Sequence, residues 1–176
     1  MNAMDWPDLM RSTRWAALGT VDAAGAPLVS AVAFAPAEGA LLVHVSQLAA
    51  HTRNLRERPR FSLLLSEPDS GEATDPQTLA RLTLSGGAAV VDRESGEDFA
   101  AAARAYLARF PEAEPRFGFG DFHLIRLTPE SGNFVGGFGR AARLDGAKIA
   151  AALENFRPRI SRITRGARGG DSCRGG

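Results

Sequence analysis

Three short apolar runs near the start of the chain lie only a few residues apart, and this spacing limits what the chain can fold into. The runs cover residues 15–21, 28–34 and 40–45, and the segments 22–27 and 36–39 between them hold the Asp, Gly and Pro residues typical of turns. Parallel neighbours would need a crossover of a dozen or more residues between strands. The spacing therefore predicts an antiparallel meander rather than βαβ units.

The rest of the chain adds strand and helix patterns of similar length. In the long strand pattern 79–91, Gly86-Gly87 predicts a bulge or bend, and Pro129-Glu130-Ser131-Gly132 predicts a hairpin-like turn between two late strands. The other predicted strands are 60–65, 122–127 and 133–135, and the predicted helices are 6–12, 49–57, 95–110 and 145–156. This set favours a small antiparallel β-barrel, because closure removes exposed sheet edges. Side chains fill a barrel of this size, so we expect a flat cofactor to lie outside it, in a cleft between two protomers.

The composition is that of an ordinary globular protein, with 44% hydrophobic and 23% charged residues among 176. No apolar run approaches the length of about 18 residues that spans a bilayer, and the N-terminus lacks the layout of a secretory signal. We therefore expect one domain, a cytoplasmic location and no membrane contact. The single cysteine, Cys173, excludes an internal disulfide. The histidines His44, His51 and His123 lack ligand-like spacing, so no metal site is expected.

The charge is unevenly distributed along the chain. From Arg157 onward there are six arginines and one acidic residue, Asp171, whereas the net charge of the whole chain is +1. The first 156 residues are therefore mildly acidic, and we expect no nucleic-acid partner. The Arg/Gly composition of 157–176 predicts a disordered, solvated tail.

Polar side chains gather where the third strand leads into the first internal helix. Ser46 ends the strand, and His51, Thr52, Arg53 and Asn54 follow at the start of the helix. Free backbone N–H groups and the positive end of the helix dipole favour anions at such a place. The segment predicts a phosphate-bearing cofactor, with Arg53 more simply an exposed helix residue.

Two other histidines have plainer interpretations. His44 sits inside an apolar strand and is expected to be partly buried with its polar atoms satisfied. His123 lies between Phe122 and Leu124, so it is expected to point to the opposite face of its strand and to have a structural role. No nucleophile–base pair is evident, so catalytic residues are not assigned, and any chemistry would be carried by the cofactor.

Four stretches together resemble a known superfamily. The chain is similar to the FMN-binding split barrels of the pyridoxamine 5′-phosphate oxidase type, and within them to the haem-utilisation (HugZ/HutZ-like) branch. The stretches that carry the resemblance are 48–55, 75–76 with 81–86, 106–113, and 120–124 with 134–141.

The resemblance implies a mainly β fold with α-helices: a six- to seven-stranded antiparallel split β-barrel over residues 5–144, flanked by helices. Residues 145–156 then form a C-terminal helix and 157–176 the tail. It also implies a homodimer with FMN at the subunit interface and a small-molecule substrate. The positions that match the cofactor site are Ser46, His51, Thr52 and Asn54 of one subunit, with Arg81 and Thr83 of the other. Arg81 is equally well explained as a solvated strand residue.

Two departures from the family pattern bear on function. Vitamin B6 oxidases place a lysine near the position of His51, and this chain has no lysine before Lys148, which argues against pyridoxamine phosphate oxidation. Haem-degrading relatives use a histidine near the C-terminus, whereas none follows His123 here, so haem ligation would fall to His51, His123 or His44. Three functions stay open: an FMN-dependent oxidoreductase as the first hypothesis, a haem-binding or haem-degrading protein, and a barrel that binds a partner without a cofactor.

Overall fold

A single curled antiparallel sheet dominates the structure. The computed structural model describes residues 4–71, 75–137, 140–154 and 156. Within them the strands are β1 (Trp15–Val21), β2 (Pro27–Ala33), β3 (Ala35–Ala37), β4 (Ala40–Ser46), β5 (Arg60–Ser66), β6 (Arg81–Val90), β7 (Phe122–Val135) and β8 (Ala141–Asp145). Their order is β2-β1-β5-β6-β7-β4-β3, with β8 paired to the end of β7.

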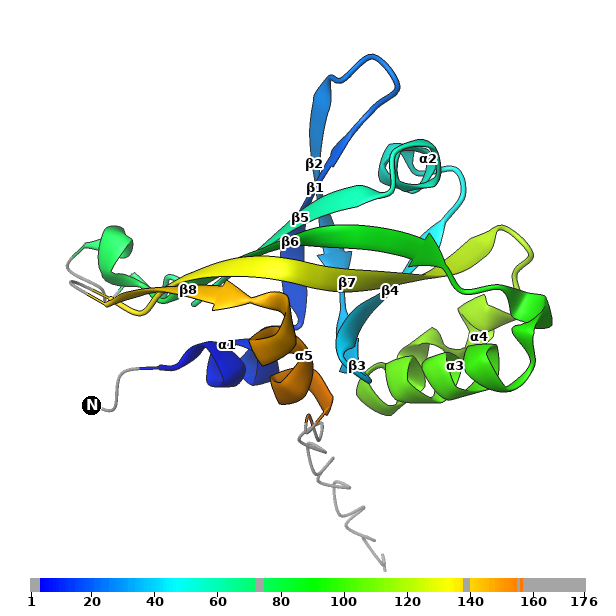
Figure 1. Cartoon of the computed structure of the whole chain (residues 1–176). Coiled ribbons are helices and arrows are strands. Elements are labelled where there is room, and N and C mark those ends of the chain that lie inside the picture. The colour runs from blue at the N-terminus through cyan, green and yellow to red at the C-terminus, as the bar shows by residue number, and fades with distance from the viewer. Residues whose placement is uncertain (1–3, 72–74, 138–139, 155, 157–176) are drawn as a thin grey trace, which may run out of the picture.

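The two ends of this strand order are consecutive parts of the chain. Only Phe34 separates β2 from β3, and Phe34 donates its backbone N–H to the carbonyl oxygen of Arg14. The sheet must therefore curl to bring β3 and β4 round toward β2 (Figure 1). The turn after β3 uses Glu38 and Gly39, both with positive φ. This curled antiparallel sheet with flanking helices confirms the predicted mainly β split barrel.

The barrel is filled by its own side chains. Alternate residues of β5 are buried, and Phe61, Leu63 and Leu65 point inward, as the two-residue period of a strand requires. They join one large apolar cluster with Leu18 and Val43. A second cluster covers the outer face of β4, which is why β4 is buried on both faces.

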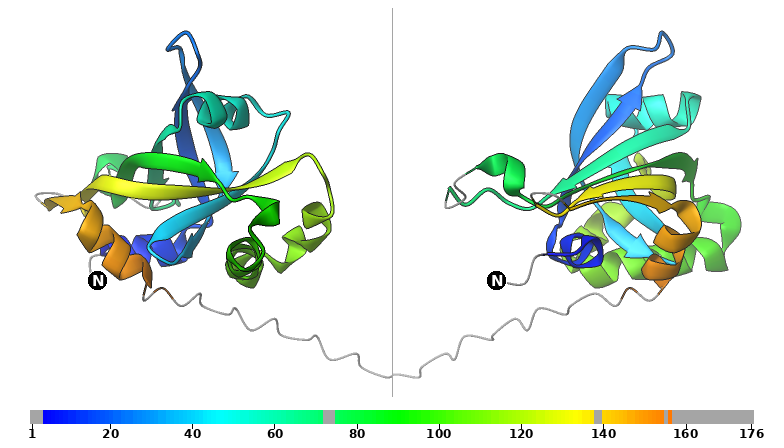
Figure 2. Two further views of the ribbon diagram at one scale, coloured as in Figure 1. Left: turned by 45° about the vertical axis from the view of Figure 1, so that its right-hand side comes forward. Right: turned by 60° about the vertical axis from the view of Figure 1, so that its left-hand side comes forward.

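Helices cover the ends and one outer face of the barrel (Figure 2). They are α1 (Trp6–Ser12), α2 (Ala50–Glu57), α3 (Glu97–Arg109), α4 (Glu114–Phe117) and α5 (Gly146–Glu154), with 3-10 turns at Pro76–Thr78, Arg93–Ser95 and Pro111–Ala113. Asp5 caps α1, as expected, by accepting a hydrogen bond from the N–H of Asp8 at 2.8 Å. Tyr106 and Ala102 of α3 pack onto β4. Of the helices in the described part of the chain, none has the length and hydrophobicity needed to cross a bilayer.

Two predicted features differ from the structure. The hairpin-like turn predicted at residues 129–132 is wrong, because β7 runs without a break from Phe122 to Val135. Short strand β8 was not predicted, and the helix predicted at 145–156 is observed at Gly146–Glu154. The predicted tail, 157–176, lies outside the described residues.

Candidate functional site

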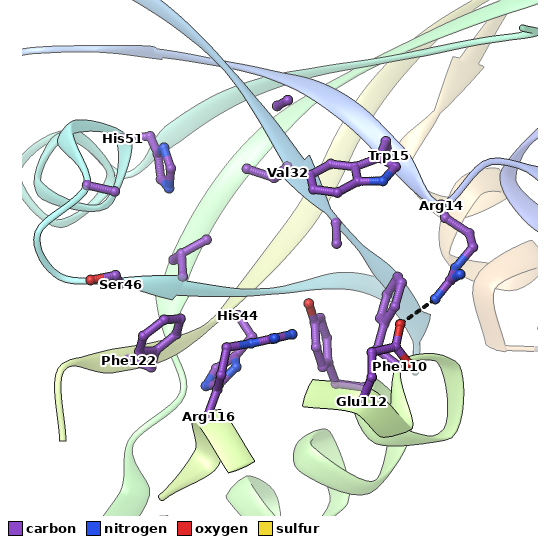
Figure 3. Close-up of a pocket in the computed structure, with 15 residues that line it drawn as sticks. Arg14, Trp15, Val32, His44, Ser46, His51, Phe110, Glu112, Arg116 and Phe122 are labelled. Atoms are coloured by element: carbon purple, nitrogen blue, oxygen red, sulfur yellow. Dashed lines mark hydrogen bonds and ion pairs between the residues drawn. The ribbon is translucent and has the colours of Figure 1, made fainter. Parts of the chain in front are cut away.

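A pocket of about 540 Å³ lies on the outside of the barrel, in line with the expectation that a flat ligand would bind outside it. Strands β2 and β4 form its floor, the start of α2 lies on one side, and α4 with the end of α3 lies on the other (Figure 3). Its walls combine aromatic, small aliphatic, imidazole and charged side chains. The lining residues are Arg14, Trp15, Ala31, Val32, Ala33, His44, Val45, Ser46, Ala49, His51, Tyr106, Phe110, Glu112, Arg116 and Phe122.

His44 lies on the β4 side of the pocket, surrounded by aromatic rings. Its imidazole stacks on Phe117, with ring centroids 4.0 Å apart and an interplanar angle of 14°, and meets Tyr106 edge-on at 5.7 Å. Burial, with the nearby charges of Arg116 and Arg93, lowers its pKa to about 4. Its Nδ1 atom is buried without a hydrogen-bond partner in the described residues, so the prediction of a satisfied histidine is wrong. His44 is a neutral imidazole at pH 7.

His51 reaches the pocket from the first turn of α2. Its ring points from the helix toward β4 (Figure 3), and its Nε2 atom is buried without a hydrogen-bond partner in the described part of the chain. Burial lowers the pKa of His51 below its usual value. A neutral imidazole with an uncommitted nitrogen is the form that ligates metals.

His123 does not line the pocket, although its Nε2 atom, like that of His51, is buried without a hydrogen-bond partner in the described residues. It pairs with Val45 in the β4–β7 ladder, whereas its neighbour Phe122 lines the pocket. Burial lowers the pKa of His123, and Arg56 and Arg93 act in the same direction. The predicted alternation along this strand is confirmed.

Three charged side chains line the pocket. Arg14 forms an ion pair with Glu112 at 2.7 Å, drawn as a dashed line in Figure 3, and its guanidinium lies over the ring of Phe110. Arg116 is half-buried on α4 and has no ion-pair or side-chain hydrogen-bond partner among the described residues. The pocket therefore carries one net positive charge.

The four predicted cofactor residues around α2 are brought close together, but most of their polar atoms are already bonded. Ser46 donates from Oγ to Asp121 at 3.1 Å and accepts from the N–H of Leu48. Thr52, fully buried, donates to the carbonyl oxygen of Ser46 at 2.7 Å. Asn54 donates to the hydroxyl of Thr20 at 3.0 Å, a buried pair that fastens α2 to β1. Of the four, only Ser46 and His51 line the pocket.

Arg81 and Thr83 lie elsewhere on the same chain. Arg81 begins β6, pairs with Val135, and donates to the carbonyl oxygens of Gln77 and Leu79. Neither Arg81 nor Thr83 lines the pocket. Within one chain the two predicted groups of phosphate-binding residues are therefore separate. Arg81 and Thr83 of a second copy would be needed to complete the predicted site.

Most of the residues that line the pocket were not predicted from the sequence. Arg14, Trp15, Phe110 and Arg116 come from four separate elements or connections, and only the folded chain brings them together. One signal was present: residues 106–113 belong to the stretches that resemble relatives, and Arg116 lies three residues after their end.

Known proteins share both the fold and much of the sequence. The family model described as "CREG, beta-barrel" matches residues 7–149. The haem oxygenase HutZ of Vibrio cholerae is 38% identical over 137 residues, which is 73% of this chain and 73% of HutZ. The non-canonical haem oxygenase HOZ of Arabidopsis thaliana chloroplasts is 40% identical over 120 residues, or 66% of this chain and 34% of HOZ.

Solved structures of other proteins share the fold of this chain. A haem-binding protein from Mycobacterium smegmatis superposes with a TM-score of 0.72 at 32% identity, covering 86% of this chain and 62% of that one. A Clostridium acetobutylicum protein of the pyridoxinephosphate oxidase family superposes with a TM-score of 0.58 over 81% of this chain and 92% of that one; its 16% identity speaks to the fold alone.

The curled sheet with an outer pocket places this protein in the class of split β-barrels, close to the HutZ-type haem-utilisation proteins. More specifically, the chain belongs to the CREG β-barrel family. It spans only about three fifths of the Mycobacterium smegmatis chain and one third of the plant protein.

Proposed function

We propose that this protein binds haem in the outer pocket and acts in haem utilisation, as the names of its relatives state for them. The observation that carries the proposal is that His51 lines a pocket with several aromatic side chains and has a buried Nε2 atom without a hydrogen-bond partner in the described residues. Imidazole nitrogen is a common axial ligand of haem iron, and burial keeps His51 in the neutral form that ligation needs.

The pocket residues suit haem in other respects. Trp15, Phe110 and Phe122 offer apolar surface for a flat macrocycle. Arg116 supplies a positive charge that would attract the acidic substituents of haem. When bound, haem would supply an iron centre able to bind dioxygen; the chain's own part is to hold the ring, ligate the iron and limit the access of water.

Haem takes precedence over FMN, the first hypothesis from the sequence, for two reasons. The relatives over 30% identical that are named for a ligand are named for haem. Thr52 and Asn54 were expected to hold the flavin phosphate, but their side chains donate hydrogen bonds to Ser46 and Thr20 instead. Oxidation of a small molecule through FMN is therefore the weaker candidate.

The proposal includes a homodimer with the ligand at the subunit interface. Ala31 of β2 lines the pocket, and the residues level with it on the neighbouring strands are Ala17, Leu64 and Thr83. These small or apolar side chains point out of the barrel, so the edge of the pocket continues into an uncovered sheet face. A second copy on this face would lie against the pocket, with its own Arg81 and Thr83 available.

A haemin titration followed by absorption spectroscopy tests the function. The wild-type protein should give a saturable Soret band, and His51→Ala should shift that band and weaken binding at least about tenfold. His123→Ala is the matched control, because the Nε2 atom of His123 is also buried and unpartnered in the described residues but His123 does not line the pocket, so the spectrum of this variant should equal that of the wild type. A protein that takes up FMN but not haemin, or a His51→Ala variant with an unchanged spectrum, would contradict the proposal.

A further inference from the structure

The two pocket arginines have different electrostatic surroundings. Arg14 is neutralised by Glu112, which accepts its hydrogen bond at 2.7 Å, and the same contact helps to hold the pKa of Glu112 below its usual value. Arg116 also acts on Glu112 through its charge, but it has no carboxylate at ion-pair distance among the described residues. Arg116 is thus the pocket cation whose charge is left for a ligand.

The surroundings of Arg116 strengthen its attraction for an anion. It is half-buried on α4 beside His44 (Figure 3), and the imidazole of His44 in turn stacks on Phe117 and meets Tyr106 edge-on. Neutral His44 adds no competing positive charge near pH 7. Apolar rings exclude water, and an ion pair in such surroundings is stronger than one on an open surface. A guanidinium also matches a carboxylate with two parallel hydrogen bonds.

His51 and Arg116 lie on opposite sides of the pocket. His51 comes from α2 above the β4 ribbon in Figure 3, and Arg116 comes from α4 below it. A ligand that fills the pocket would therefore lie between α2 and α4, within reach of both side chains. An acidic substituent on the side near α4 would meet Arg116.

We infer that Arg116 binds a free carboxylate on the edge of the ligand and so selects acidic tetrapyrroles over their esterified counterparts. The inference rests on the proposed haem binding and adds its specificity: Arg116 contacts the ligand edge, while His51 serves the iron. Aromatic walls alone would favour the less polar ester, because it has less charge to desolvate. A preference for the acid must then come from a cation, and Arg116 is the one not already paired.

Haemin and haemin dimethyl ester, titrated into the same proteins, test this. The wild type should bind haemin about 10- to 100-fold more tightly than the ester, the range expected for a hydrogen bond to a charged group. Arg116→Gln should lose this preference and bind both ligands alike, and Arg116→Lys should keep part of it. The Soret position of the haemin complex should be the same in Arg116→Gln and in the wild type, because iron ligation is untouched.

Arg104→Gln is the matched control. Arg104 is exposed on α3, pairs with Glu97 at 2.9 Å and does not line the pocket, so its loss should leave both affinities unchanged. Thermal unfolding without ligand should show that Arg116→Gln is folded, since its side chain makes no hydrogen bond to lose in the described residues.

The outcomes separate the two proposals. If the wild type binds haemin and its ester equally, or if Arg116→Gln keeps the preference, the role of Arg116 is overturned while haem binding stands. If the wild type binds neither ligand, both proposals fall.

Discussion

His44 is buried among aromatic rings, and one of its ring nitrogens has no hydrogen-bond partner in the described residues. Desolvation is the main reason that its pKa falls to about 4, and the charges of Arg116, Arg93 and His123 add to the effect. In the unfolded chain the pKa returns to about 6.5. Between these two values the unfolded state binds more protons than the folded state, so the free energy of unfolding decreases as the pH falls from about 6.5 to 4.

The His44→Gln variant tests this linkage. For the wild type, His44 alone should reduce the free energy of unfolding by about 2 kcal/mol between pH 7 and pH 5, and His44→Gln should lack that part of the pH dependence. Urea unfolding at the two pH values measures it. His123→Gln is the comparison, because Asp121 partly opposes the fall in the pKa of His123. An equal pH dependence in His44→Gln and wild type would contradict the assignment.

Arg109 shows how one residue supports the pocket from a distance. Its guanidinium donates to the carbonyl oxygens of Met10, Arg11 and Thr13 at the end of α1, and lies over the ring of Phe34. These bonds tie the end of α3 to the segment that leads directly into Arg14 and Trp15, two walls of the pocket. Satisfying α1 carbonyls in this way also compensates for burying the cation.

At the scale of elements, a bulge between β6 and β7 explains both a correct and a wrong prediction. The register passes from Ser85 opposite Ser131 to Gly86 opposite Pro129, so Glu130 is the extra residue. The bulge predicted at Gly86-Gly87 is therefore confirmed. Residues 129–132 resemble a turn because they include Pro, which cannot donate a ladder hydrogen bond, and Gly. In the structure they form the β7 side of the same bulge. The displaced Glu130 reaches Arg60 at 2.7 Å.

Gly86→Ala is expected to disrupt this bulge. A Cβ atom at position 86 would overlap the carbonyl oxygen of Thr128 and lie 2.9 Å from the backbone nitrogen of Glu130. We expect a loss of about 3 kcal/mol in the free energy of unfolding, because neither backbone atom can move without breaking the β6–β7 ladder. Gly87→Ala is the control: its nearest contact is an ordinary 3.6 Å to Glu130, so its effect should stay below about 1 kcal/mol. Urea titration of both variants measures the two free energies of unfolding. Equal values would contradict the close approach of Gly86 to the backbone of Thr128 and Glu130.

Elements with strong local signals were predictable, and the contacts between them were not. The capped helix α1 and the alternating strand β5 follow from residues near in sequence. The polar start of α2 was also recognised, but the contact of Asn54 was not predictable: Thr20 is 34 residues away in sequence, and only the fold shows that Asn54 bonds to it and holds the helix to β1. Arg116 was not predicted as a site residue for the same reason, because its role depends on His44 and Glu112, which only the fold brings near it.

At the scale of the whole molecule, one face of the sheet is left uncovered. Leu64 of β5 is 41% exposed and stands between Ala17 of β1 and Thr83 of β6. In the described residues the helices lie at the barrel ends and along β4, which leaves this face open (Figures 1 and 2). Small side chains around one large apolar residue would let another sheet face approach closely, and in the proposed dimer the adjoining pocket edge would link association to ligand binding.

Replacing Leu64 by Glu tests the proposed dimer. The wild type at micromolar concentration should have twice the mass of one chain in light scattering after gel filtration, and Leu64→Glu should be a monomer, because association would bury two unpaired carboxylates. Since a second subunit would adjoin the pocket, Leu64→Glu should also bind haemin more weakly. Val90→Glu, with a similar exposed fraction of 42% near the other end of β6, should stay dimeric and bind normally. A monomeric wild type would overturn the proposed dimer, and a dimeric Leu64→Glu variant that keeps its affinity would show that Leu64 does not lie in the interface.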